Sequence, residues 1–92
     1  MPYIKPSRRQ PLDALVADFA QLRDDYGVSE GELNYLLTRL LLEWTGGVRS
    51  YALLCSARGI LQDVKDEFYR RVVAPYEDTK REANGDVFSA TD

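Results

Sequence analysis

The longest helical pattern in the sequence lies in its second half. Apolar side chains recur every third or fourth position over five turns, at Leu54, Ala57, Leu61, Val64, Phe68 and Val72. Such a stripe lies along one side of an α-helix and does not fit the two-residue repeat of a strand. The pattern predicts one long helix with Ser50 as its N-cap. Gly59 within it predicts the close approach of another backbone or a mild kink.

Two further helices are predicted upstream. The first begins at Pro11, whose missing N–H suits a first helical turn, and ends before Gly27; its apolar stripe is Leu12, Leu15, Val16, Phe19 and Leu22. The second begins at Ser29, which has the capping-box spacing to Glu32, and ends at residues 46–47; its stripe is Leu33, Leu36, Leu37, Leu40 and Trp44.

Pro75 should end or kink the third helix at Ala74, because proline cannot donate the next helical hydrogen bond. It could itself open a short last helix through about Ala83. No alternating strand pattern occurs in the sequence. We therefore predict an all-α fold, a small single-domain bundle of three to four helices completed by oligomerisation. Residues 1–10 are expected to form an extended arm, 11–84 the helical domain and 85–92 a flexible tail.

The residue types present restrict the chemistry. The 92 residues include no histidine and a single cysteine, Cys55. An intramolecular disulfide is therefore excluded, a zinc site lacks its usual ligands, and the commonest general base is missing. We expect a non-enzymatic protein without cofactor or metal. Because so small a core contributes little net stability, the composition favours self-association into a homo-oligomer.

Charge and hydropathy limit the kinds of partner that the protein is expected to bind. Twelve basic and fifteen acidic residues give a net charge of −3, which argues against bulk nucleic-acid binding. The basic arm (Lys5, Arg8 and Arg9) would add only modest, salt-sensitive affinity. No apolar run approaches the roughly 20 residues of a membrane span, and the first ten residues lack the apolar core of a signal peptide. We expect a cytoplasmic protein without a membrane partner.

One face of the second helix carries residues that a small bundle does not need. With Leu37 at the centre of the inward face, Tyr35 and Leu42 fall on the opposite side, close to Arg39. Aromatic residues and arginine are enriched at protein contacts, so this face is a candidate oligomer interface. The alternative is that single exposed apolar residues are ordinary and need no explanation.

A candidate anion-binding surface follows the third helix. Arg58, Lys65 and Tyr69 line up along one edge of its apolar stripe, Arg71 borders the opposite edge, and Arg70 points away and is free to reach a partner. Cations with a stackable ring suit a phosphate or carboxylate and a base, so the ligand-binding candidates are Arg58, Lys65, Tyr69, Arg70, Arg71 and Tyr35.

The alternative for these cations is an internal salt-bridge network. Glu67 with Arg71 and Asp66 with Arg70 have i,i+4 spacing, and Glu43, Glu77 or Asp78 could neutralise Arg58 or Lys65. Asp63, Asp66 and Glu67 could hold a divalent ion, although acids on an outer helix face are usually solvated. Cys55 is expected to pack as a small residue rather than act as a nucleophile.

Several stretches carry a resemblance. They are the "MPYI" start, "GELNYLLTRLLL" (residues 31–42), "FYRRVVAPYEDTK" (68–80) and "NGDV" (84–87). Together they resemble a family of small uncharacterised all-α proteins found in bacteriophages and environmental bacteria. The intervening "LLCSARGILQDVKDEF" fits more loosely. The resemblance implies no established activity, but it implies the host cytoplasm as location if the chain is phage-encoded.

Phages use small helical proteins as virion parts, as inhibitors of host proteins and as oligomeric sponges that sequester nucleotide immune signals. By analogy of class, the leading hypothesis is a homo-oligomer that binds a small anionic ligand of nucleotide type. The alternative is a protein-binding adaptor that docks through Tyr35, Leu42 and Trp44. A third hypothesis is a carboxylate–metal enzyme using Asp63, Asp66 and Glu67.

Overall fold

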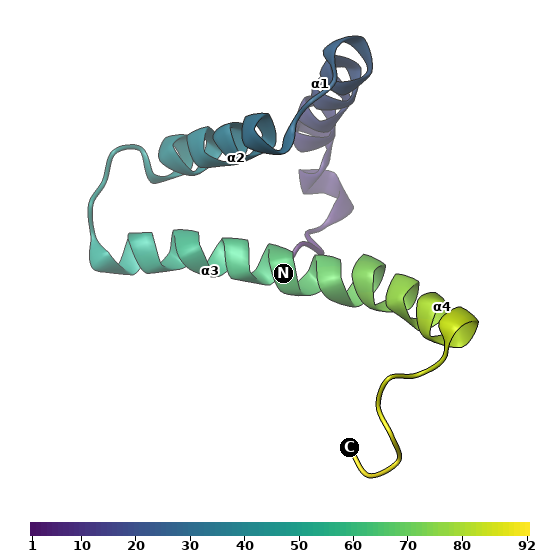
Figure 1. Ribbon diagram of the computed structural model, residues 1–92. Helices are drawn as coiled ribbons and strands as arrows, with labels where there is room; N and C mark the ends of the chain where they lie inside the picture. The colour runs from purple at the N-terminus through teal and green to yellow at the C-terminus, as the bar shows by residue number, and fades with distance from the viewer. The chain divides into compact units, whose positions relative to one another are not determined.

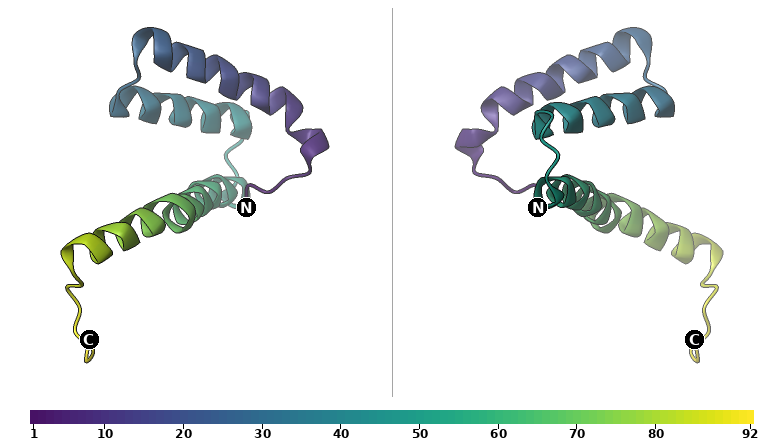
Figure 2. Two further views of the ribbon diagram at one scale, coloured as in Figure 1. Left: turned by 90° about the vertical axis from the view of Figure 1, so that its right-hand side faces the viewer. Right: turned by 90° about the vertical axis from the view of Figure 1, so that its left-hand side faces the viewer.

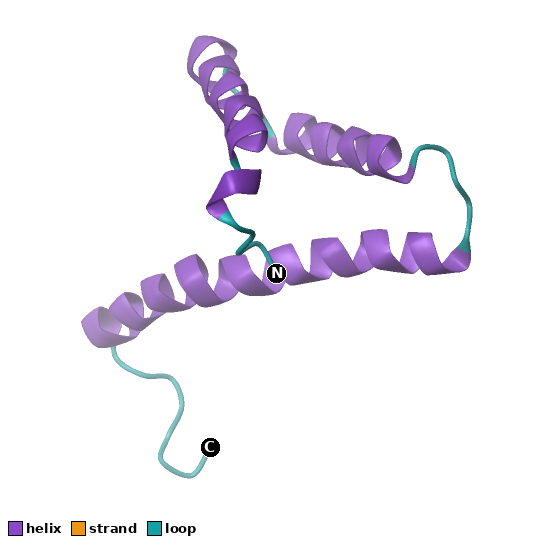
Figure 3. Ribbon diagram, turned by 180° about the vertical axis from the view of Figure 1, so that it is seen from behind, coloured by secondary structure: helices purple, strands orange, loops and turns teal.

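The computed structural model describes residues 1–92 and is all-helical, which confirms the predicted class. Figures 1 and 3 show helices and connecting loops without strands. The elements in chain order are η1 (Pro6–Arg8), α1 (Gln10–Tyr26), α2 (Glu30–Thr45), α3 (Tyr51–Phe68), η2 (Tyr69–Val73) and α4 (Ala74–Asn84). The arm expected to be extended thus contains a 3₁₀ turn, η1. The last eight residues contain bends and turns only.

The start of α2 is capped as the sequence predicts. The Glu32 N–H donates to the Ser29 hydroxyl at 3.2 Å, and the Ser29 N–H donates to the Glu32 carboxylate at 3.0 Å. This reciprocal pair is a capping box, which satisfies two of the N–H groups that a helix leaves unpaired at its start. The two hydrogen bonds to Ser29 lower the pKa of Glu32, because they favour the ionised carboxylate.

The end of α2 and the start of α3 also follow local rules. Gly46 takes the left-handed conformation at φ 59°, and its N–H bonds back to the Leu42 and Glu43 carbonyls. A side chain at this φ would be strained, which explains why glycine ends the helix. The Leu53 N–H then donates to the Ser50 hydroxyl at 3.2 Å, so Ser50 caps α3 as predicted.

The chain divides into two compact units, and the boundary falls within α3 at Gly59. The N-terminal unit comprises residues 2–58, and the C-terminal unit comprises residue 1 with residues 59–92. A Cβ added at Gly59 would meet no atom within 4 Å. The close backbone approach expected at this glycine is therefore absent.

The apolar stripes are placed on the helices as predicted, but most of their residues are not buried. In α3 only Ala57 is buried, at 7% exposure, whereas Leu61 and Val64 remain exposed. The reason is that burial needs a second layer opposite the stripe. In the N-terminal unit, for example, no Cα atom of α1 lies within 8 Å of one of α2, although packed helix axes are only about 8–10 Å apart.

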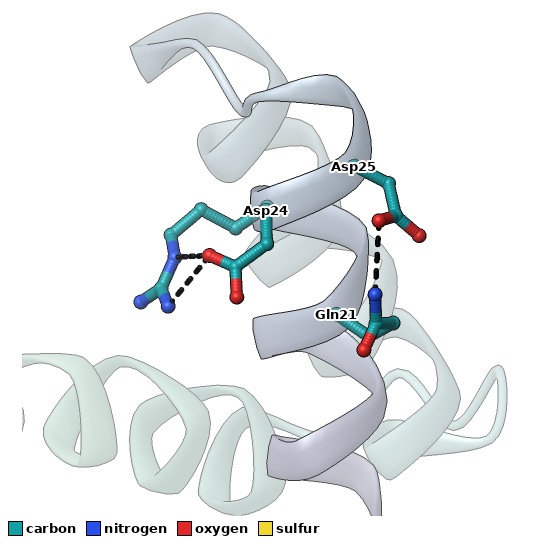
Figure 4. A network of polar contacts seen from close by, with 4 residues as sticks. Gln21, Asp24 and Asp25 are labelled. Carbon is teal, nitrogen blue, oxygen red and sulfur yellow. Dashed lines mark hydrogen bonds and ion pairs between the residues drawn. The ribbon is translucent and has the colours of Figure 1, made fainter.

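Hydrogen bonds made by side chains are local. No side-chain hydrogen bond joins residues more than five positions apart. Figure 4 shows this at the end of α1, where Gln21 donates to Asp25 at 2.9 Å. One turn of the same helix also contains the ion pair of Arg23 with Asp24, at 3.0 Å. These bonds stabilise single helices and leave the apolar faces available for contacts.

Candidate anion-binding site

The candidate site is centred on a π-helical segment, η2 (Tyr69–Val73), which contains three of the predicted ligand residues: Tyr69, Arg70 and Arg71. The Ala74 N–H bonds to the Tyr69 carbonyl, five residues back instead of four. Pro75 accounts for this widening, because its ring clashes with the carbonyl four residues earlier and it has no N–H to donate. The wider turn accommodates both the proline ring and the missing hydrogen bond.

The π-helical segment η2 lets the helix continue past Pro75. The helix neither ends at Ala74 nor breaks, since α3, η2 and α4 follow one another without an intervening loop (Figures 1 and 2). The last helix extends to Asn84, and Gly85 follows it at φ 92°. Single π-turns inside α-helices are rare and are frequently found at functional sites.

Arg70 does not remain free, which differs from the prediction. Its Nε donates to the Glu67 carboxylate at 2.8 Å, and Nη2 contacts the same oxygen. The predicted pairs Asp66–Arg70 and Glu67–Arg71 do not form; Asp66 instead accepts from the Gln62 amide. Residues three and four apart are both neighbours on a helix, so Glu67 can reach either arginine, and Arg70 occupies it.

Lys65 and Arg71 consequently have no carboxylate within 4.0 Å, and both are exposed. Asp78, an expected neutralising partner, pairs with Arg81 instead, at 3.5 Å. The exposed Tyr69 side chain lies between Lys65 and Arg71 in the sequence, one turn after Lys65. Lys65, Tyr69 and Arg71 are therefore exposed within about two turns, with Arg71 on the opposite edge of the apolar stripe from Lys65 and Tyr69.

Two predicted ligand residues belong to the N-terminal unit. Arg58 lies at the end of that unit, exposed and without an ion pair. Tyr35 accepts a hydrogen bond from Arg39 Nη1 at 3.1 Å, and the guanidinium lies 5.9 Å from its ring centroid. Tyr35 and Arg39 thus meet on the outer face of α2, as the helical phase predicted, and Leu42 is exposed there too.

The chain belongs to a family without an assigned function. The family described as "Domain of unknown function (DUF6899)" matches residues 1–87, a range that includes every helix and every candidate ligand residue. No curated protein and no solved structure matches the chain.

Asp63 and Glu67 of α3 are engaged in ion pairs. Asp63 lies 3.5 Å from the Met1 ammonium, and Glu67 pairs with Arg70. No three carboxylate or cysteine side chains come together as a metal-binding group. Cys55 is exposed, which contradicts the expected packing role. None of the helices is both long and apolar enough to cross a membrane.

The sequence reasoning missed a second group of cations beside Tyr69. A hollow of about 690 Å³ in the C-terminal unit is lined by Tyr69, Lys80, Arg81 and Phe88, among others. The adjacent cations in "TKR" at residues 79–81 were the available signal. Three acids, Glu77, Asp78 and Asp86, line the same hollow, so its charge does not favour an anion.

Proposed function

We propose that the protein is a non-enzymatic homo-oligomer that binds a small anionic ligand. The observation that supports this proposal most directly is the pair of exposed cations, Lys65 and Arg71, that have no carboxylate partner within 4.0 Å. Only Arg23, Arg70 and Arg81 of the twelve lysines and arginines pair with a carboxylate, so the lack of a partner is not in itself unusual in this chain. Lys65 and Arg71 differ from the other unpaired cations in lying within six residues of each other on either side of the exposed Tyr69.

The chemistry of the surface favours a phosphate-bearing ligand with an aromatic part. Lys65 supplies a point charge and Arg71 a planar fork that binds phosphate or carboxylate through two hydrogen bonds. Tyr69 offers a ring on which a base can stack. Arg70 could join by exchanging the Glu67 carboxylate for the ligand. Arg58 and Tyr35, which belong to the N-terminal unit, would be contributed by another copy of the chain.

A nucleotide-type signal is the ligand that this proposal favours, and sequestration without turnover is the proposed activity. Its support is the resemblance to small phage proteins together with the absence of histidine from the sequence. Tight binding without chemistry would remove the signal from the host cytoplasm, as an anti-defence sponge does. The proposal requires no cofactor and no membrane.

Native mass spectrometry of protein purified without denaturation tests this proposal. A discrete oligomer that carries extra mass of nucleotide size is expected. Lys65→Ala and Arg71→Ala should each weaken binding of that nucleotide by about 10- to 100-fold, because each removes a charge-assisted hydrogen bond. Arg81→Ala is the matched control, since Arg81 already pairs with Asp78. Normal binding by both Lys65→Ala and Arg71→Ala would refute the assignment.

A second candidate function, a protein-binding adaptor, has its own support. Trp44 is 54% exposed and Tyr35 is 63% exposed on α2, and both residue types are common energetic anchors of interfaces. This function predicts a host or phage protein that is retained by the wild type and lost by Trp44→Ala, and no bound nucleotide.

A further inference from the structure

The N-terminal unit has a second apolar surface besides the outer face of α2. The facing sides of α1 and α2 line a groove of about 440 Å³. Figure 2 shows the two helices running in opposite directions from the turn that joins them. The groove residues are Leu15, Val16, Asp18, Phe19, Leu22, Leu33, Leu36, Leu37 and Leu40.

From this groove we infer that a second copy of the chain docks on the N-terminal unit, so that two α1–α2 hairpins form a four-helix bundle. The inference deepens the self-association in the proposed function by giving it a surface, and it rests on that function only for the existence of an oligomer. It replaces Tyr35, Arg39 and Leu42 as the main contact between copies.

The area of the groove supports a dimer. Six of its side chains expose between 40% and 65% of their surface: Leu15, Val16, Leu22, Leu33, Leu37 and Leu40. Together they present on the order of 600 Å² of apolar surface, near the upper limit for soluble monomers. A stable interface buries about 800 Å² on each partner. The six side chains alone therefore supply about three quarters of the area that a stable dimer needs.

The chemistry of the groove favours a copy of the same hairpin over an unrelated protein. Asp18 is its only polar lining residue. Such depletion of charge is typical of homodimer interfaces, whereas transient contacts carry more polar groups. An occupant must therefore offer an equally apolar helical face, and the hairpin has one. A two-fold axis would place the same patch on both sides of the contact.

The spacing of the groove residues matches the packing of a bundle. On α2, Leu33, Leu36 or Leu37, and Leu40 follow the alternating three- and four-residue spacing of a knobs-into-holes seam, and α1 repeats it at Leu15, Phe19 and Leu22. No Cα atom of α1 lies within 8 Å of one of α2, so the two seams do not interdigitate with each other. Side chains of another hairpin can insert between them.

Sedimentation velocity on the full chain, over a range of concentrations, tests the inference. Leu37→Glu places a charge in the groove, and Leu42→Glu places the same charge on the outer face of α2. The two leucines are matched in exposure, at 44% and 48%. We expect the wild type and Leu42→Glu to dimerise, and Leu37→Glu to dissociate at least about 100-fold more readily because a buried charge is left unpaired.

Val16→Glu is the second variant, because Val16 is 65% exposed and its replacement removes little contact within the chain. It should also be monomeric, with far-UV circular dichroism like that of the wild type. A monomeric wild type at all concentrations would overturn the inference and point to a groove covered within one chain. Loss of the dimer in Leu42→Glu but not in Leu37→Glu would move the interface to the outer face.

Ligand binding separates this inference from the proposed function. Dimers that dissociate with Leu37→Glu but bind no nucleotide would refute the function and leave the docking surface standing. Nucleotide binding by a monomeric wild type would refute the docking surface and the oligomeric part of the proposed function, and would leave only its ligand-binding part.

Discussion

Replacing Ser29 with alanine removes one half of the α2 capping box and tests how local the stability of this chain is. The Ser29 hydroxyl accepts the Glu32 N–H at 3.2 Å, and nothing else in the structure bonds to that hydroxyl. Both residues are exposed, so water can take over the freed N–H. The cost should therefore lie near the middle of the range for such substitutions, about 1 kcal/mol rather than 2.

This cost is measurable in a domain of 92 residues. A change of about 1 kcal/mol shifts the Tm of a domain of 60–100 residues by about 4–8 °C. Thermal and urea denaturation followed by far-UV circular dichroism should both show the loss. Ser29→Asp keeps an acceptor at the same position and should retain most of the stability.

Ser56→Ala is the matched control. Ser56 lies within α3, is exposed and forms no side-chain hydrogen bond. The same serine-to-alanine change there should be neutral or slightly stabilising, because alanine has the higher helix propensity. Equal melting temperatures for Ser29→Ala and the wild type would refute the capping argument.

The remaining predictions concern pH, two glycines and a proline. The folded-state pKa of Glu32 is lowered. Its carboxylate therefore contributes to folding stability above the unfolded-state pKa, and this stability is lost as pH falls through the folded-state pKa. The difference in unfolding free energy between the wild type and Glu32→Gln should accordingly disappear when denaturation is measured at increasingly acid pH. Gly59→Ala should stabilise by about 0.5–1 kcal/mol, because the added Cβ meets no atom within 4 Å. Gly46→Ala should destabilise by about 1 kcal/mol because Gly46 has φ 59°. Urea denaturation of the two glycine variants should therefore show changes in unfolding free energy of opposite sign. Pro75→Ala should restore a donor to the Arg71 carbonyl and relax η2 to an α-helix, with a gain above about 1 kcal/mol; amide hydrogen exchange at residues 70–75 would show whether this occurs.

Much of the candidate site followed from helical phase. Tyr35 and Arg39 meet on one face of α2, as a spacing of four residues requires. The choice of ion pairs did not follow, because Glu67 has Arg70 three residues and Arg71 four residues away, and spacing alone does not rank them. The hollow that Lys80 and Arg81 line together with Tyr69 was missed because residues of the C-terminal tail complete it, and the tail has no helical periodicity from which to place them.

The sequence by itself determined where helices start and stop and which side chains share a face. The helix ends are set by Ser29, Gly46 and Ser50. These residues act through hydrogen bonds or backbone angles that involve residues at most four positions away, so their effect on the helix ends does not depend on distant contacts. Only the tertiary structure decided that, within the N-terminal unit, the stripes of α1 and α2 do not pack closely against each other. An apolar stripe such as that of α3 marks a side to be buried, but burial depends on a second layer, and the spacing within one helix carries no information about what lies opposite it.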